Sequence, residues 1–257
     1  MSYVIPDPRW EEPNLLIPGK KPIGPVVLSP RLAQEVSAAN LRPVHFFIYN
    51  QGNYDLVTEK SLDVYGGEAN FYRNNVTASS PPGYFTLPTA LSASATKGLY
   101  LVYRCRIVDP TSRANHFELS ANSGDDRAGV QSRPDLSGDP FRVLSRNGGT
   151  YATADSTGHD ARFSEWTTYF FSRSDQTFFA FSYLNSVAGT ITSVHLGALN
   201  ASATNYTEIA LNDNANLEFE YFAAFQMDPK LSASIVPSAK AALTPFMKNP
   251  YQYLIPA

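Results

Sequence analysis

The chain of 257 residues is long enough for one large all-β domain or two smaller domains, and a hydrophobic fraction of 43% permits a sizeable core. A net charge of −3, from 20 basic and 23 acidic residues without a basic run, gives no electrostatic reason to expect a nucleic acid partner. The single cysteine, Cys105, excludes an internal disulfide and a cysteine-based metal cluster.

Residues 1–30 are predicted to form an extended arm. Seven prolines crowd this segment, and proline fixes φ and removes a backbone donor, which argues against a helix or a central strand. The arm is too apolar for a solvated tail, so we expect it to lie along a surface of its own fold or of a neighbour. The arm residues that we expect at an assembly interface are Trp10, Leu15, Leu16 and Ile17.

A jelly-roll domain with a short leading helix is predicted over residues 31–228. Ser29 and Pro30 form a helix cap and first turn, and Leu32 and Val36 share one side of the helix that we expect over residues 31–40. From about residue 43 the pattern changes to short runs rich in aromatic and β-branched residues, separated by turn-forming residues. These runs are residues 44–50, 68–74, 98–108, 116–122, 141–147, 150–155, 166–173, 177–185, 190–199 and 217–225. Many short strands without long helices between them indicate an antiparallel sandwich or barrel.

The runs at 166–173 and 177–185 are apolar on both faces, whereas a sandwich strand normally buries one face. In the first run we expect Trp166, Thr168 and Phe170 on one face, opposite Tyr169 and Phe171. The outer face is therefore predicted to be covered by the arm, by the C-terminal tail or by a partner subunit.

Residues 229–257 are predicted to form a short helical and extended tail. Asp228 and Pro229 signal a helix entry, and residues 237–247 favour a helix that Pro245 should break. The chain ends on apolar and aromatic residues, which indicates a docked terminus. The tail residues that we expect at an assembly interface are Tyr251, Tyr253, Leu254 and Ile255.

Two glutamates at alternate positions, Glu218 and Glu220, could form a catalytic pair on one face of a strand. Retaining glycoside hydrolysis needs two carboxyl groups roughly 5–5.5 Å apart and a partner that tunes them. The next position on the same face is Phe222, and the core face is expected to hold Leu217, Phe219 and Tyr221. We therefore interpret the glutamates as the solvated outer face of a strand, and predict that the protein is not an enzyme.

No cofactor is predicted. The four histidines show no metal-ligand spacing, and no G-x-S-x-G or phosphate-binding glycine motif is present. Asp125 and Asp126 are weak candidates for binding Ca²⁺ through a loop. No apolar run approaches the roughly 20 residues that span a membrane, and the first residues lack a secretion-signal pattern, so no membrane partner is expected.

Several motifs occur in a characteristic order. WTTYFF (166–171) precedes FFAFSYLN (178–185), then Leu196-Gly197 and EYFAAFQMDPKLS (220–232). This order resembles the concanavalin-A-like and laminin-G-like jelly roll, although Ser186 stands where that family has glycine.

Both ends of the domain carry further motifs. KKPIGPVV (20–27) precedes SPRLAQEV (29–36), and KNPYQYLIP (248–256) closes the chain. These patches are similar to the ends of bacteriophage and prophage jelly-roll proteins, with Tyr251 in place of a tryptophan. The resemblance implies a virion protein that is made in the cytoplasm of a bacterial host.

Three hypotheses follow. The first is a structural virion component, namely a capsid decoration protein that binds the major capsid protein, other virion proteins or sister subunits in a homo-oligomer; the apolar arm and tail favour it. The second is a glycan-binding virion protein that contacts the host surface, for which Tyr72, Tyr84 and Tyr151 are eligible. The third is a glycoside hydrolase, but this sequence lacks the set of carboxylates that such an enzyme needs.

Overall fold

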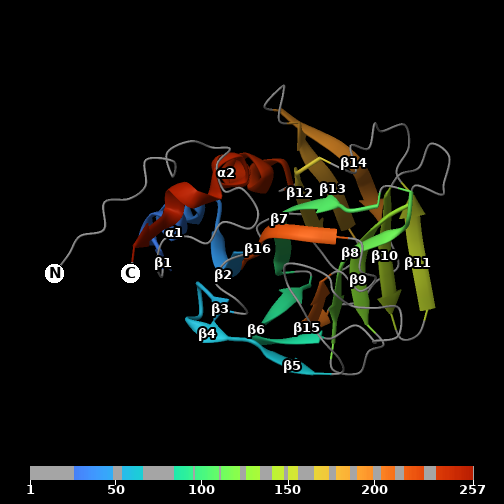
Figure 1. The fold of residues 1–257 in the computed structure, drawn as a ribbon, viewed down its shortest axis with the longest axis horizontal. Coiled ribbons are helices and arrows are strands. Elements are labelled where there is room, and N and C mark those ends of the chain that lie inside the picture. Colours follow the sequence, from blue (N-terminus) through green and yellow to red (C-terminus); the bar gives the residue numbers. More distant parts are fainter. Residues whose placement is uncertain are drawn as a thin grey trace.

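Two antiparallel β-sheets and a helical layer make up the described part of the molecule (Figure 1). The computed structural model describes residues 26–48, 54–65, 84–94, 96–109, 111–121, 126–133, 141–147, 150–155, 165–173, 178–185, 190–198, 204–211, 217–228 and 236–256. This architecture confirms the predicted all-β antiparallel jelly-roll sandwich.

The larger sheet has seven strands in the order β11-β10-β9-β8-β15-β6-β5. They are β5 (Asp63–Tyr65), β6 (Tyr84–Ala93), β8 (Ala114–Ser120), β9 (Arg127–Ser132), β10 (Phe141–Asn147), β11 (Thr150–Asp155) and β15 (Thr204–Leu211). The second sheet has six strands in the order β14-β13-β12-β7-β16-β2. They are β2 (Leu41–Ile48), β7 (Gly98–Ile107), β12 (Thr167–Arg173), β13 (Phe178–Asn185), β14 (Thr190–Ala198) and β16 (Leu217–Met227).

The remaining elements are short. Two small ribbons pair β1 (Val26–Leu28) with β17 (Leu254–Pro256), and β3 (Tyr54–Asp55) with β4 (Lys60–Ser61). The helices are α1 (Pro30–Ser37), α2 (Val236–Lys248) and the 3-10 turn η4 (Pro250–Tyr253). No helix in the described ranges is long and apolar enough to cross a membrane.

An aromatic core fills the space between the two large sheets. Tyr103 of β7 stacks on Tyr169 of β12 at 5.4 Å between ring centroids, and Tyr169 stacks on Phe181 at 5.5 Å. Phe117 of β8 contributes an edge-to-face contact to Phe171 at 5.1 Å. Burial of such large side chains is the main favourable term in folding, so this core accounts for the close packing of the sheets.

A second apolar cluster lies on the outer face of the six-stranded sheet. Leu32 and Val36 of α1, with Leu243 and Phe246 of α2, pack there against sheet residues that include Phe170. Figure 1 shows both helices on this side of the molecule. The prediction that the two-sided apolar strand 166–173 needs a cover is thus confirmed, and the cover includes the C-terminal segment of the same chain.

Helix α1 begins as its sequence predicts. The side chain of Ser29 accepts a hydrogen bond from the backbone of Arg31 at 3.2 Å, and Leu32 and Val36 are buried. The helix ends at Ser37, and Asn40 follows in the left-handed region with φ 57°, which asparagine tolerates better than most residues. The helix is therefore shorter than the predicted segment 31–40.

Helix α2 corrects one prediction, because Pro245 does not break it. The helix runs from Val236 to Lys248 with Pro245 inside, and the hydroxyl of Thr244 donates to the Lys240 carbonyl at 2.7 Å. A proline in a helix interior removes a backbone hydrogen bond and costs about 3 kcal/mol. The next residue, Phe246, is fully buried in the outer cluster, and this packing offsets the loss.

A bulge in β16 corrects the predicted faces of that strand. Leu217 and Phe219 lie in the core as predicted, but the pairing with β7 shifts between Phe219 and Tyr221, so Glu220 is the additional residue. Beyond the bulge the faces are exchanged: Tyr221 packs in the outer cluster and Phe222 in the core. Strict alternation predicted Tyr221 on the core face and Phe222 on the outer face, and both predictions are wrong.

Several strands have no clear signal in the sequence. The pattern missed β6, β9 and β15, together with the short strands β1, β3, β4, β5 and β17. Pro88 lies within β6, β9 contains few apolar residues, and the apolar residues of β15 do not alternate strictly along the strand. Their sheet neighbours, rather than local propensity, define them. The predicted run at 68–74 lies outside the described residues.

Candidate functional site

Three side chains from neighbouring strands form a line across the outer face of the six-stranded sheet; we call Trp166, Arg106 and Glu218 the binding row. Arg106 of β7 pairs in register with Glu218 of β16. Its Nε lies 2.6 Å from Glu218 Oε2, and its guanidinium carbon lies 5.1 Å from the centre of the Trp166 ring. Trp166 immediately precedes β12, which pairs with the other edge of β7. The row therefore rests on three adjacent strands.

The binding row is accessible and chemically mixed. The side chains of Arg106 and Glu218 are 42% and 21% exposed, and Trp166 is half-buried. Val108, two residues after Arg106, is 58% exposed. Stacking on an aromatic ring holds a guanidinium in a defined orientation. The row thus presents an aromatic surface, fixed hydrogen-bond donors and a carboxylate acceptor side by side.

The next residues on this face form a polar triad around a buried carboxylate. Tyr251 of η4 donates to Glu220 Oε1 at 2.5 Å, and Arg104 Nε lies 3.3 Å from Glu220 Oε2. Glu220 is only 3% exposed. Burial raises the pKa of Glu220, and the charge of Arg104 and the hydroxyl of Tyr251 partly oppose that shift. Burial also raises the pKa of Tyr251, so its hydroxyl remains a donor at neutral pH.

The two glutamates therefore have different environments. Both project from the outer side of the sandwich, as predicted, and each pairs with its own arginine. Glu218 is partly solvated, but the prediction of a solvated face is wrong for Glu220. The C-terminal segment covers Glu220, since Tyr251 contacts it directly.

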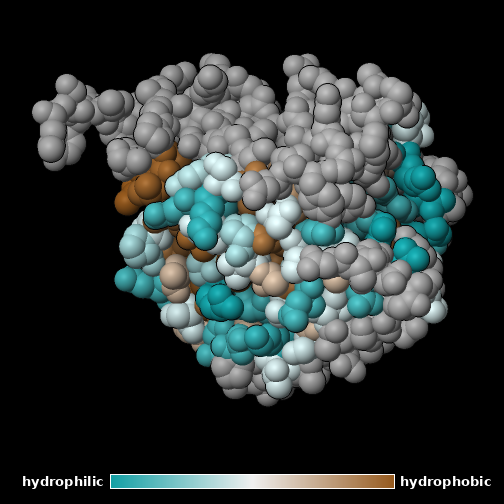
Figure 2. Space-filling model, turned by 90° about the horizontal axis from the view of Figure 1, so that it is seen from below, coloured by the Kyte–Doolittle hydropathy of each residue, from teal (hydrophilic) through white to brown (hydrophobic). Residues whose placement is uncertain are grey.

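The tail residues predicted at an assembly interface divide into two groups. Tyr251 and Tyr253 are buried within their own chain, and Tyr253 donates to Glu35 of α1 at 2.6 Å. Ile255 is 44% exposed and pairs across the ribbon with Val27, which is 36% exposed. Figure 2, seen from below Figure 1, shows hydrophobic colour concentrated at the left edge, where Figure 1 places the C-terminus.

Other predicted site residues lie outside the described residues; they are Trp10, Leu15, Leu16, Ile17, Tyr72 and Asp125, together with the side chains of Tyr84 and Tyr151. The weak calcium candidate Asp126 is described, and its carbonyl accepts a hydrogen bond from Ala121 at 3.1 Å. Within the described part of the chain, no group of three or more metal-ligating side chains occurs.

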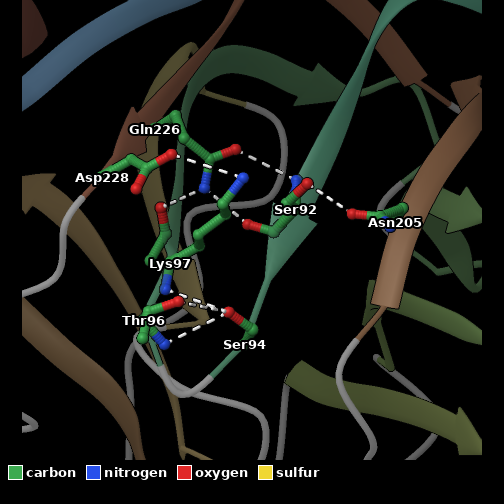
Figure 3. Close-up of polar contacts among 8 residues, drawn as sticks. Ser92, Ser94, Thr96, Lys97, Asn205, Gln226 and Asp228 are labelled. Atoms are coloured by element: carbon green, nitrogen blue, oxygen red, sulfur yellow. Dashed lines mark hydrogen bonds and ion pairs between the residues drawn. The ribbon is translucent and has the colours of Figure 1, made fainter.

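A second polar cluster lies where the chain crosses from β6 in one sheet to β7 in the other (Figure 3). The side-chain amide of Gln226, in β16, donates to the Ser92 carbonyl at 2.6 Å and accepts from the Ser92 backbone at 3.0 Å. Lys97 approaches Asp228 at 3.4 Å, and the hydroxyl of Ser94 accepts from the Lys97 backbone at 3.1 Å. These contacts connect the β6–β7 turn to the end of β16, which is a structural role.

The two described histidines with placed side chains are core residues. His45 lies 2.7 Å from Asp55 through Nδ1 and 2.7 Å from the Thr89 carbonyl through Nε2, which must donate because a carbonyl only accepts. His116 lies 3.0 Å from the Tyr103 hydroxyl, and burial lowers its pKa to about 3. Both imidazoles are fully buried, so they connect strands and do not form a reaction site.

The outer face of the seven-stranded sheet carries paired charges. Arg142 donates to both carboxylate oxygens of Asp155, at 2.5 and 2.8 Å. Arg127 binds Glu118 at 2.7 Å. These pairs are similar in length to the Arg106–Glu218 pair, and they lie on the other sheet.

Sequence comparisons with protein families and with curated proteins give no match. Solved structures do resemble the fold. The binding domain of botulinum neurotoxin serotype D superposes with a TM-score of 0.50 at 9% identity, over 81% of this chain and 53% of that one. Its ligand binding domain in complex with N-acetylneuraminic acid gives 0.46 at 11% identity, over 80% and 52%. Galectin LEC-6 of Caenorhabditis elegans gives 0.41 at 12% identity, over 60% and 94%.

At these identities the likeness concerns the fold alone. The chain spans about half the length of the toxin binding domain that it resembles. Together with the two antiparallel sheets, the comparison defines the protein as a jelly-roll β-sandwich.

The sequence interpretation missed both arginines of this region. A signal was present, because Arg104-Cys105-Arg106 repeats the alternate spacing of Glu218-Phe219-Glu220. Opposite charges at alternate positions of two strands favour cross-strand pairs if the strands are neighbours. Only the order β7-β16 in the sheet shows that they are.

Proposed function

We propose that this protein is a glycan-binding jelly-roll domain and that the binding row is its contact surface. The observation that carries the proposal is the Arg106 guanidinium, which lies over the Trp166 ring while pairing with Glu218 at 2.6 Å. An aromatic ring beside a few fixed polar groups is typical of a small-molecule site.

The chemistry of the row favours a hydroxyl-rich ring over other ligands. One face of a sugar ring consists of C–H groups, which pack on an aromatic surface, while its hydroxyls both donate and accept hydrogen bonds. Trp166 and the exposed Val108 supply apolar surface, Arg106 supplies donors, and Glu218 supplies an acceptor. One positive and one negative side chain do not favour a strongly anionic ligand such as a phosphate.

The fold comparison is compatible with this proposal and adds limited support. The structure with a TM-score of 0.50 is a toxin binding domain, of which the match covers 53%. Fold alone does not determine function, and the proposal therefore rests on the binding row.

A glycan array with the purified chain, followed by calorimetry on the best ligand, tests the proposal. Trp166→Ala and Arg106→Ala should each weaken binding by at least about tenfold, the effect of losing one central contact of roughly 1.4 kcal/mol. Arg127→Ala is the matched control, because Arg127 forms an arginine–glutamate pair of similar length on the other sheet. Equal losses in all three variants, or no bound glycan, would contradict the proposal.

Catalysis is tested on the same ligand. Because each glutamate is paired with an arginine, we propose that the protein binds glycans without cleaving them. Chromatography of the glycan after prolonged incubation should recover it intact. Cleavage products that disappear with Glu218→Gln would instead assign a hydrolase.

A second candidate function is the structural virion role implied by the sequence resemblance. The observation that favours it is the exposed apolar pair Val27 and Ile255 on the ribbon of β1 and β17. Burying such side chains against a sister subunit or a capsid protein would be favourable by roughly 1.5–3 kcal/mol each.

Analytical ultracentrifugation tests the assembly role. We expect the double variant Val27→Ser, Ile255→Ser to self-associate less than the parent. When purified protein is added to particles that lack it, the double variant should also occupy fewer sites than the parent. Val108→Ser is the control, since Val108 is exposed but lies outside the ribbon. If the double substitution changes neither the oligomeric state nor the particle occupancy, the ribbon is not an interface.

A further inference from the structure

We infer that the C-terminal segment formed by η4 and β17 is a positioning element of the binding row, acting through Tyr251, Glu220 and Arg104. The inference rests on the proposed function, because it assigns a role to residues beside the proposed contact surface. In this arrangement the binding row takes its ligand-binding geometry when the tail docks on the sheet.

The contacts form a continuous path from the tail to the row. Tyr251 donates to Glu220 at 2.5 Å, and Glu220 in turn binds Arg104 at 3.3 Å. Arg104 and Arg106 are two residues apart on β7 and therefore share one face of the sheet. Arg104 also pairs in register with Thr168, two residues after Trp166. Arg104 thus lies next to two members of the binding row.

The bulge in β16 makes this path possible. Glu220 is the additional residue opposite β7, and its carboxylate is placed beneath the tail and beside Arg104. A buried carboxylate is costly unless it is paired and hydrogen-bonded, so removing one partner perturbs the other. Within the described residues, the charged or titratable groups that face Glu220 are Arg104 of β7, Tyr251 of η4, and Tyr221 beside it on β16.

A second tyrosine in the same segment provides an internal control. Tyr253 also donates to a carboxylate, that of Glu35 at 2.6 Å, and lies under Arg31 at 5.6 Å. This contact fastens the tail to α1 and not to the row. Loss of the Tyr253 hydroxyl should therefore remove a tail hydrogen bond comparable to that of Tyr251, but without affecting Glu220.

The path predicts a pH-dependent signal at Trp166. Burial raises the pKa of Glu220, and the Tyr251 hydroxyl lowers it. Protonation of Glu220 as pH falls removes the charge that holds Arg104, so the surroundings of Trp166 should change in the same transition. Removing the Tyr251 hydroxyl should raise the pKa of Glu220 further and move the transition to higher pH.

The experiment is a fluorescence titration in a Trp10→Phe background, which leaves Trp166 as the single tryptophan. We expect a transition in the parent, a shift to higher pH in Tyr251→Phe, no shift in Tyr253→Phe, and loss of that component in Glu220→Gln. A component that remains in Glu220→Gln does not belong to this path and should not respond to Tyr251→Phe. Far-ultraviolet circular dichroism of each variant confirms that it is folded.

Binding is then measured on any glycan found for the parent. Tyr251→Phe should weaken it by about fivefold or more, the lower end of coupling between linked sites, and Tyr253→Phe should not. Superimposable titrations of the parent, Tyr251→Phe and Glu220→Gln would overturn the inference. The titration needs no ligand, so the absence of a bound glycan would contradict the proposed function while leaving the coupling measurable.

Discussion

Gln226 of one sheet and Ser92 of the other form a two-point hydrogen bond across the sandwich. The Gln226 amide donates to the Ser92 carbonyl at 2.6 Å and accepts from the Ser92 backbone at 3.0 Å, while Nε2 also donates to the Gly98 carbonyl at 2.8 Å (Figure 3). The side chain is almost fully buried. It thus supplies hydrogen-bond partners to backbone groups of both β6 and β7.

The first prediction concerns Gln226→Glu. The introduced carboxylate would face two carbonyl oxygens, so we expect a loss of roughly 3 kcal/mol or more in the free energy of unfolding at pH 7. Its folded-state pKa would be raised, so the lost stability should partly return as pH falls toward about 4. Urea unfolding at pH 7 and pH 4 measures both effects. Gln226→Met is the control, and its deficit should not depend on pH.

The second prediction concerns acid stability. Burial lowers the pKa of His116 to about 3, whereas an unfolded histidine has a pKa near 6.5. The neutral form is favoured in the folded state, so this stability is present above pH 6.5 and is lost as pH falls toward 3. Each pKa unit corresponds to about 1.4 kcal/mol, which gives a loss on the order of 5 kcal/mol.

His116→Gln isolates this effect, because glutamine does not titrate. Urea unfolding at pH 7.5, 5.5 and 4.5 should show a smaller decline in stability for the variant than for the wild type. Parallel declines would mean that the folded protein accommodates a charged His116, contrary to its burial among Tyr103, Phe141 and Tyr169.

The third prediction compares two neighbouring residues of α2. Phe246 packs against Phe46 at 5.2 Å and Phe225 at 5.2 Å, so Phe246→Ala should cost about 3–5 kcal/mol. Pro245 is exposed inside the helix, so Pro245→Ala should instead add stability, by about 1–3 kcal/mol, through a restored backbone donor. Thermal unfolding of both variants checks the opposite signs. Destabilisation by Pro245→Ala would show that the helix requires the proline geometry.

The fourth prediction concerns the start of the described structure. Val26 is buried and pairs with Pro256 across the terminal ribbon. Deleting residues 1–28 should therefore lower the midpoint of thermal unfolding by about 4–8 °C relative to deleting residues 1–25, since it exposes about 2 kcal/mol of apolar contact. Equal midpoints would mean that the ribbon contributes nothing to stability.

The class of fold, and the need for a cover on one sheet, could be predicted from local patterns in the sequence. Aromatic and β-branched runs separated by turn residues indicated an antiparallel sandwich, and the two-sided apolar run ending at Phe171 indicated that something covers its outer face. Capping at Ser29 likewise located the start of α1. These features depend on local periodicity and hydrogen bonding, which a single sequence carries directly.

The position of the candidate site could not be predicted from the sequence, because it depends on a bulge and on strand order. Glu220 is buried and hydrogen-bonded to the tail because a bulge shifts the pairing of β16 by one residue. Alternation in the sequence does not reveal a bulge. Arg106, Trp166 and Glu218 came together because strands distant in the chain are neighbours in the sheet. Strand order arises from the burial of whole faces, and no local stretch of sequence encodes it.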